Sequence, residues 1–195
     1  MRDLEIRGAG SILGGQQHGH MEAVGYEMYI KLLSDAIAEE KGEKKPEDTA
    51  ECLVDLRIPA HIPNNYISNI NQRIEVYKKI AAVKNEEDAS DVIDELIDRF
   101  GDVPKAVKGL IDVALLRNMA QNQGIFEITQ RENMIMFYSK TLNMPRALRL
   151  VEEIKGRAVI NAGEKPYIGV KLIKGDDPLF IIRESLKVMN EVENA

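Results

Sequence analysis

The apolar residues after Glu51 repeat with a period that changes twice, and this pattern constrains the fold more than any other feature of the sequence. Residues 52–58 alternate with a period of two, which predicts a half-buried strand that ends at Pro59. The next three segments repeat every three to four residues, which predicts helices joined by short loops and packed against one another. We expect them at residues 70–84, 86–100 and 104–123.

The last third of the chain returns to short alternating runs. Residues 125–129 and 134–138 flank a polar turn, which predicts a β-hairpin. Two further strands, at 158–161 and 167–172, lie between a helix at 145–155 and a terminal helix that begins at Asp177 and Pro178. The predicted fold class is α+β: a three-helix half, then a small antiparallel sheet with covering helices, preceded by a glycine-rich segment and a linker helix.

The first 48 residues have a different character. The segment 3–20 holds five of the fourteen glycines, and residues 24–41 show a helical repeat before the charged, proline-containing stretch KGEKKPEDTA. We therefore predict three parts: a glycine-rich end at 1–22, a helix and linker at 23–48, and a domain at 49–195. The third part is expected to fold without the other two.

Composition excludes several classes of protein. The chain has 195 residues, 44% of them apolar and 30% charged, and its net charge is −6. No run approaches the roughly 20 apolar residues that span a bilayer, and no signal peptide is visible, so we expect a cytoplasmic protein without a membrane partner. The single cysteine, Cys52, excludes an internal disulfide and a cysteine-based zinc cluster. The acidic balance argues against strong binding of a phosphate backbone and permits a partner with a basic surface.

No pattern in the sequence predicts catalysis, a metal or a cofactor in this chain. The glycine-rich segment matches neither the phosphate-binding loop, G-x-x-x-x-G-K-[ST], nor the dinucleotide-binding motif, G-x-G-x-x-G. The acids in VIDELID have helical spacing, so they do not form the acidic box of an ATPase. His18 and His20 flank Gly19, but the only other histidine is the distant His61, too few for a metal site. The role of His18 and His20 stays open.

The string DLEIRGAG, followed by Q-x-G, resembles the end of the TRG motif of RecG-type branch-migration helicases and bacterial transcription-repair coupling factors. The match falls on Arg7, Gly8, Gly10 and Gln17, while His18 and His20 depart from the usual pattern. The resemblance implies a segment that couples ATP-driven movement of helicase lobes to stepping along duplex DNA.

The rest of the chain resembles only the coupling factors. The strings LRIPAHIPNNYI, NQRIEVYKKIA and ELIDRFGDVP follow one another in the order and spacing of that family's C-terminal domain. The resemblance covers essentially the whole chain, and we expect the chain to be a piece of a longer protein. It implies a parent ATPase of helicase superfamily 2 that uses ATP and Mg, acts on duplex DNA and stalled RNA polymerase, and recruits excision repair.

The helix predicted at 86–100 is strongly acidic. Its seven acids are opposed within the helix only by Arg99; they are Glu86, Glu87, Asp88, Asp91, Asp94, Glu95 and Asp98. On composition alone this is a solvated face or a docking surface for arginines. The resemblance implies the second: a domain that docks on a UvrB-like N-terminal module and masks the surface that recruits UvrA.

The docking residues implied by the resemblance are Glu95 and Asp98, with Asp91 and Asp94 on the same helix. We expect Glu95 and Asp98 to be exposed. The apolar stripe of the helix is expected to face inward; it comprises Val92, Ile93, Leu96, Ile97 and Phe100.

Two other functions stay open on the sequence alone. The first is an independent enzyme built on the glycine-rich segment, which ATPase and ligand-binding assays on the chain would detect. The second is a free-standing acidic adaptor without a motor, which the absence of upstream helicase motifs in its reading frame would support.

Overall fold

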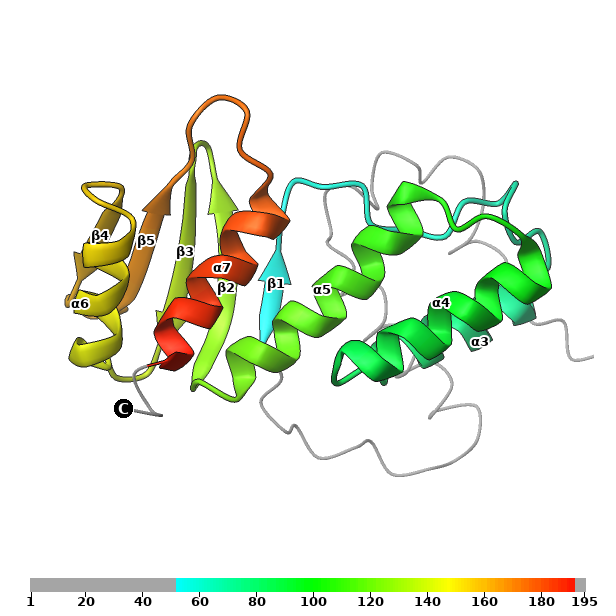
Figure 1. The fold of residues 1–195 in the computed structure, drawn as a ribbon, viewed down its shortest axis with the longest axis horizontal. Coiled ribbons are helices and arrows are strands. Elements are labelled where there is room, and N and C mark those ends of the chain that lie inside the picture. Colours follow the sequence, from blue (N-terminus) through cyan, green and yellow to red (C-terminus); the bar gives the residue numbers. More distant parts are fainter. Residues whose placement is uncertain (1–51, 192–195) are drawn as a thin grey trace, which may run out of the picture.

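The computed structural model describes residues 52–191, which form a layered α/β domain with a helical extension (Figure 1). The helices are α3 (Ile70–Ala81), α4 (Glu86–Phe100), α5 (Lys105–Gln121), α6 (Met144–Glu153) and α7 (Pro178–Glu191). The strands are β1 (Leu53–Asp55), β2 (Ile125–Arg131), β3 (Met134–Ser139), β4 (Ala158–Asn161) and β5 (Tyr167–Lys171). The predicted α+β class is confirmed. The glycine-rich segment and the linker helix lie outside the described residues.

The five strands form one sheet in the order β1-β2-β3-β5-β4. The hairpin of β2 and β3 is antiparallel, and β5 pairs antiparallel with both β3 and β4. The edge strand β1 instead pairs parallel with β2, with Val54 opposite Ile128. The small antiparallel sheet predicted for the last third of the chain is therefore extended by the strand predicted at 52–58, which adds a parallel edge. The pairing is parallel because the chain passes through α3, α4 and α5 between β1 and β2.

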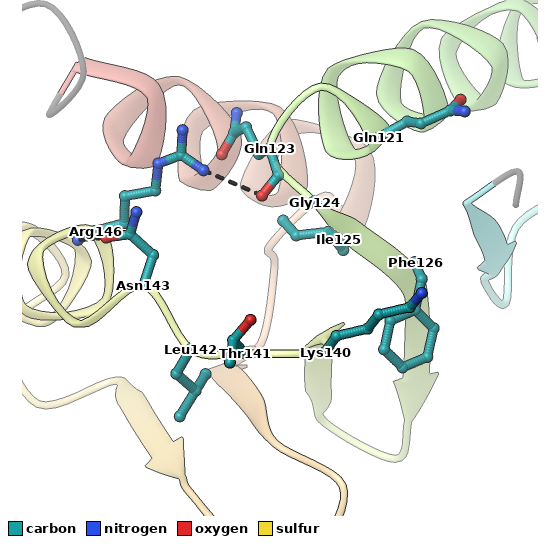
Figure 2. Close-up of a pocket in the computed structure, with 10 residues that line it drawn as sticks. All are labelled: Gln121, Gln123, Gly124, Ile125, Phe126, Lys140, Thr141, Leu142, Asn143 and Arg146. Carbon is teal, nitrogen blue, oxygen red and sulfur yellow. Dashed lines mark hydrogen bonds between the residues drawn. The ribbon is translucent and has the colours of Figure 1, made fainter.

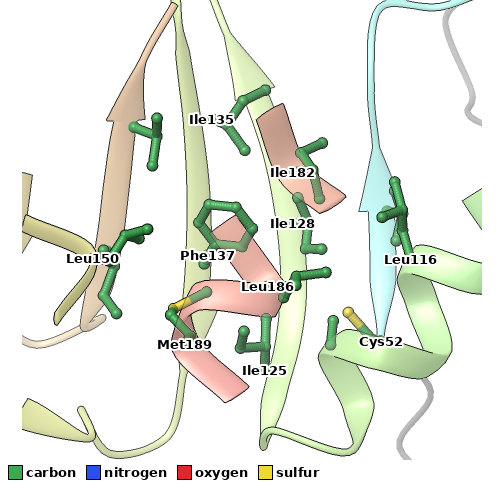
Figure 3. Packing of buried hydrophobic residues seen from close by; sticks show 14 of the residues in the cluster. Cys52, Leu116, Ile125, Ile128, Ile135, Phe137, Leu150, Ile182, Leu186 and Met189 are labelled. Carbon is green, nitrogen blue, oxygen red and sulfur yellow. The ribbon is translucent and has the colours of Figure 1, made fainter. Parts of the chain in front are cut away.

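The main core lies between the sheet and the helices α5, α6 and α7 (Figure 3). Strand residues such as Ile128, Ile135 and Phe137 are at most 1% exposed and face Leu150 of α6 and Leu186 of α7. All three helices pack on the same face of the sheet, as their shared cluster requires. Burial of this many large side chains is the main stabilising contribution to the sheet half.

A second core joins α3, α4 and α5 away from the sheet. Tyr77, Ile80 and Leu96 are buried there against Leu110 of α5. Helix α5 belongs to both cores, since one part of it packs under the sheet and the rest packs between α3 and α4. It is therefore the element that fixes the helical half relative to the sheet half.

Gly109 explains how the proline loop after β1 lies against α5. A Cβ atom at this position would sit 2.8 Å from the carbonyl oxygen of Pro59. Only glycine permits the backbone of the loop to approach the helix this closely. This loop connects β1, at the edge of the sheet, to the start of α3.

The sheet face opposite the helices is covered by its own side chains. The ring of Tyr138 lies between Phe126 and Tyr167, at centroid distances of 6.5 and 5.3 Å, and the Nζ atom of Lys165 lies 4.4 Å from its centroid. Lys165 also pairs with Glu127 at 2.9 Å. Tyr138 is consequently only 6% exposed, although all the helices that pack on the sheet in residues 52–191 lie on the other face.

Candidate functional site: the acidic helix α4

Helix α4 begins and ends at strong local signals. The side chain of Asn85 accepts a hydrogen bond from the N–H of Asp88, and three acids occupy the first turn, where the helix dipole favours negative charge. Gly101, at φ +79°, ends the helix, and its N–H donates to the carbonyl of Ile97. The sequence therefore fixes where α4 begins and ends.

The outer face of α4 consists of Asp91, Asp94 and Asp98, and we use that name for these three residues. Steps of three and four residues place them along one side of the helix, roughly opposite the buried Leu96. All three are exposed, and no salt bridge within residues 52–191 involves them. The outer face is therefore a row of uncompensated carboxylates.

Glu95 lies on the side of α4 that faces α3, in a different electrostatic setting. Its carboxylate accepts hydrogen bonds from Lys79 Nζ at 2.6 and 2.7 Å and from Arg99 Nη1 at 2.5 Å. Glu75 of α3 completes the group at 3.4 Å from Lys79 and 3.3 Å from Arg99. We call these four residues the α3–α4 salt-bridge cluster. Its two acids and two bases neutralise one another.

The cluster shifts the titration of its members. Hydrogen bonds from Lys79 and then Arg99 hold the pKa of Glu95 below its usual range. The pKa of Glu75 is lowered chiefly by its hydrogen bond with Arg99. The bonds to Glu95 raise the pKa of Lys79 and of Arg99 in turn. At neutral pH all four groups are charged, and Glu95 has both oxygens engaged.

The structure therefore separates Glu95 and Asp98, which the sequence treats as a pair. Asp98 is exposed as predicted. Glu95 is half-buried, its side chain 35% exposed and bound to Lys79 and Arg99, so the prediction that it is freely exposed is wrong. The reason is a cross-helix contact with α3 that the pattern of α4 alone does not contain. The sequence does contain one hint of this contact: Glu75 and Lys79 are four residues apart, so they present opposite charges on one side of α3.

Ile97 is a second departure from the sequence prediction. The helical repeat predicts Ile97 in the buried stripe of α4, yet it is 46% exposed. Leu96 is buried, whereas Val92, Ile93 and Phe100 are half-buried against the second core. Ile97 lies at the margin of the stripe, on the flank away from Glu95, where no described helix covers it fully.

The structure also contains an open cavity of about 610 Å³ at one end of the sheet (Figure 2). It is lined by the turn from α5 to β2, residues 121–126, and by the connection from β3 to α6, residues 140–146. Arg146, 6% exposed, donates from Nη1 to the carbonyl of Gln123 at 3.0 Å. None of the residues that line the cavity belongs to α4.

The translocation-motif residues Arg7, Gly8, Gly10 and Gln17 lie outside the described residues, and their assignment stays a prediction. The same holds for His18 and His20. Within residues 52–191, no group of three or more His, Cys, Asp or Glu side chains is arranged to hold a metal ion. In the same part of the chain, no helix has the length and apolarity needed to cross a membrane.

Comparison with known proteins identifies the domain that contains α4. Residues 56–147 match the TRCF domain family. The chain carries a TRCF domain. It is similar to the transcription-repair-coupling factor of Staphylococcus aureus (strain USA300), with 37% identity over 176 residues. The corresponding protein of Staphylococcus haemolyticus (strain JCSC1435) is 35% identical over the same length. Each alignment covers 88% of this chain, which spans only 14% of the length of these relatives.

A solved structure supports the fold of the TRCF domain. The crystal structure of the C-terminal domain of a transcription-repair coupling factor superposes with a TM-score of 0.62 at 23% identity, covering 74% of this chain and 94% of that one. The family match runs from just after β1 into α6, so the outer face of α4 and the salt-bridge cluster both lie inside the TRCF domain.

Proposed function

We propose that this TRCF domain is an autoinhibitory domain of an ATP-dependent DNA translocase that displaces stalled RNA polymerase and recruits nucleotide-excision repair. In this proposal the domain docks on a UvrB-like N-terminal module of the same protein and masks the surface that binds UvrA. The similarity to transcription-repair-coupling factors supports the assignment to such a parent protein. Hydrolysis of ATP, with its Mg, belongs to the parent's motor and not to this chain.

The observation that carries the docking proposal is the outer face of α4. Its three carboxylates are exposed and, within residues 52–191, have no cation paired with them. A row of uncompensated charge strengthens attraction to an oppositely charged surface and raises the rate of encounter. Arginines are the natural partners, because the guanidinium group binds carboxylates in a bidentate geometry.

The salt-bridge cluster gives Glu95 a different place in the proposal. Since both its oxygens are engaged by Lys79 and Arg99, a partner's arginine gains less at Glu95 than at Asp98. Glu95 keeps a docking role only if the partner exchanges with one of these cations. We propose that it mainly fixes α4 against α3, so that the outer face is presented in one orientation.

Binding measured between two separate polypeptides tests this proposal. The chain is titrated with the UvrB-like module of the same parent protein, and the dissociation constant is measured by calorimetry. Replacing Asp94→Lys and Asp98→Lys together is expected to weaken binding at least tenfold, because like charges then face each other. The matched control is Glu152→Lys with Glu164→Lys, the same charge change at exposed positions of the sheet half.

The control double variant is expected to change the dissociation constant less than twofold. Equal weakening by both double variants would indicate a general effect of net charge and would contradict a specific docking surface. Unchanged binding in both would contradict docking through α4.

For the segment before the domain, the resemblance supports a role in translocation. We propose that Arg7, with Gly8, Gly10 and Gln17, transmits lobe movement to DNA in the parent protein. Arg7→Ala in that protein should then leave ATP hydrolysis largely intact while abolishing displacement of stalled RNA polymerase. Displacement equal to that of the unaltered protein would contradict this role.

A further inference from the structure

We propose that the free edge of the sheet at β4, together with an apolar stripe on α6, is an interface at which a second copy of this chain continues the sheet. The stripe consists of Met144, Leu148 and Val151, and we call these three residues the α6 stripe. Strand β4 is the last in the order β1-β2-β3-β5-β4, so within residues 52–191 only one of its two sides is paired. None of these residues belongs to α4, and the proposal does not depend on the docking function.

The pairing of β4 with β5 determines which backbone groups of β4 point toward the free edge. The N–H of Lys171 in β5 donates a hydrogen bond to the carbonyl of Arg157 at 2.8 Å. The backbone groups of an antiparallel strand alternate in direction along the chain. Those of Val159 therefore point toward β5, whereas those of Ala158 and Ile160 point away from it. The N–H and C=O groups of these two residues are available to a further strand.

The sequence of β4 does not protect this edge. Edge strands usually avoid pairing with another chain by carrying a charge, a proline or a bulge. The four residues of β4, AVIN, include neither a charge nor a proline, and they pair with β5 without a shift in register. Ala158 and Ile160 are half-buried, and Val159 is 44% exposed. The edge is therefore suited to pairing with another strand.

The α6 stripe lies along the same edge. Steps of four and three residues place Met144, Leu148 and Val151 on one side of the helix, and the first two are 45% and 52% exposed. Arg149, roughly on the opposite side of α6, lies 3.8 Å from Glu191 of α7, so the stripe faces away from α7. Because α6 contacts both α7 and β4 (Figure 1), the stripe faces outward beyond the end of the sheet.

A second copy of the chain supplies the matching surface. About a two-fold axis perpendicular to the sheet, the β4 strands of two copies pair antiparallel, and their α6 stripes meet on the helix-covered face. Strand β4 carries no charged residue, and the two arginines and two glutamates of α6 cancel. A second chain with a net charge of −6 therefore meets less repulsion here than at α4. The contact buries apolar surface that is exposed in a single copy.

The direction of the backbone groups determines the register of this pairing. Ala158 of one copy lies opposite Ile160 of the other, because two residues with outward N–H and C=O groups exchange both hydrogen bonds. Directly opposite residues share a face of the sheet, so this register keeps the helix-covered faces of both copies on the same side. Val159 then lies on the two-fold axis, opposite its own counterpart, with the two Cα atoms about 4.5 Å apart.

Disulfide formation in the full 195-residue chain tests this register. Val159→Cys places two thiols across the axis at a Cα distance within the roughly 4.4–6.8 Å that a disulfide spans. Oxidised glutathione is the oxidant: it takes up the two electrons and two protons of the thiols and is reduced to glutathione as the S–S bond forms. Asn161→Cys is the matched control, since it is exposed on the same face but its counterpart lies about 14 Å away along the strand.

We expect Val159→Cys to form a covalent dimer at least tenfold faster than Asn161→Cys. The unaltered chain should form none, because Cys52 is 0% exposed. Equal rates in the two variants would indicate random collision and would overturn the proposal. The absence of a covalent dimer in Val159→Cys would overturn it as well.

Sedimentation equilibrium tests the association without a cross-link. Between about 10 µM and about 1 mM, we expect the unaltered chain to show a monomer–dimer equilibrium. Leu148→Lys should weaken dimerisation at least tenfold, because it places a charge in an apolar contact. Ile97→Lys, the same type of change at an exposed apolar position of α4, should alter it less than twofold. Equal weakening by both variants would contradict the interface. A chain that stays monomeric throughout would overturn the proposal and leave the edge to a strand from another protein.

Discussion

Two sides of helix α4 both carry acidic residues. On one side the carboxylate is paired with cations, and on the other side the carboxylates have no paired cation within the described residues. The side facing α3 holds Glu95 in a neutral cluster with Lys79, Arg99 and Glu75. The outer face holds three aspartates without a paired cation in the described residues. With seven acids and one arginine, α4 alone carries a charge of −6, equal to that of the entire chain. The outer face accounts for −3 of this charge, and the three acids of the first turn account for the other −3, because Glu95 and Arg99 cancel.

The difference shows that an acidic helix is not one functional unit. Charges paired across two helices stabilise an orientation, and in exposed pairs this contribution is small. Unpaired charges on the outer face contribute little to folding but determine which partner can approach. Substitutions on the two sides, and at the apolar stripe between α4 and the core, should therefore separate stability from docking.

The largest effect on stability is expected at the inward-facing stripe of α4. Leu96 is 2% exposed within the second core, so Leu96→Ala removes buried apolar contacts and leaves a cavity. We expect a loss of about 2–4 kcal/mol in the free energy of unfolding. Urea denaturation measures it directly, and a loss below about 1 kcal/mol would show that α4 is not anchored by this core. Ile97→Ala, at the exposed margin, serves as the matched control.

A smaller effect is expected at the salt-bridge cluster. Glu95→Gln keeps the shape of the side chain but removes the charge that Lys79 and Arg99 share. Because the cluster is solvent-screened, we expect the free energy of unfolding to fall by no more than about 1 kcal/mol. This loss in the free energy of unfolding should become smaller at high salt. A loss that does not depend on salt would show that packing, and not charge, holds α4 against α3.

The same cluster predicts part of the acid sensitivity of the domain. The pKa of Glu95 and that of Glu75 are lowered by folding from an ordinary value of 4.5. Their contribution to the free energy of unfolding is therefore complete above pH 4.5 and is lost as the pH falls through the lowered pKa values. Stability measured between about pH 5 and pH 3 should fall less steeply in Glu95→Gln than in the unaltered chain.

Asp112 should show the opposite dependence. Burial is the main cause that raises its pKa, although Arg183 lies 2.6 Å away and opposes the shift. Because the pKa of Asp112 is raised in the folded state, its protonation stabilises the folded state at pH values below the ordinary pKa. This stabilisation is lost as the pH rises through the raised pKa. An Asp112→Asn variant that left the pH profile unchanged would contradict this assignment.

The smallest effect on stability is expected at the outer face. Asp94→Asn together with Asp98→Asn removes two exposed charges that have no paired cation in the described residues. We expect the free energy of unfolding to change by less than about 0.5 kcal/mol, or to rise slightly as repulsion within α4 is relieved. A loss above 1 kcal/mol would show that these aspartates belong to the scaffold.

The hydrophobic periodicity and the capping residues predict most of the fold. Asn85 and Gly101 mark the ends of α4, and the turn between β2 and β3 marks the hairpin, because these signals are local in sequence. The parallel pairing of β1 with β2 joins residues more than 70 positions apart, and no local pattern encodes it. The predicted strand at 52–58 shortens to Leu53–Asp55 for the same reason: its length depends on a distant partner.

The candidate site was predictable only in part. The acidity of α4 and the exposure of Asp98 follow from the sequence. The engagement of Glu95 does not, because it depends on how α3 crosses α4 and brings Lys79 within 2.6 Å. The exposure of Ile97 depends on the same packing angle. Contacts between helices decide both features, and periodicity describes each helix alone.

The most direct test of the central claim measures capture of UvrA by the full-length parent protein. If the outer face of α4 holds the domain in a docked state, Asp94→Lys with Asp98→Lys should open it and increase UvrA binding at least tenfold. Glu95→Gln should have a much smaller effect, since Glu95 is already neutralised within the TRCF domain. Unchanged UvrA binding in the outer-face variant, with an increase in Glu95→Gln, would contradict this account.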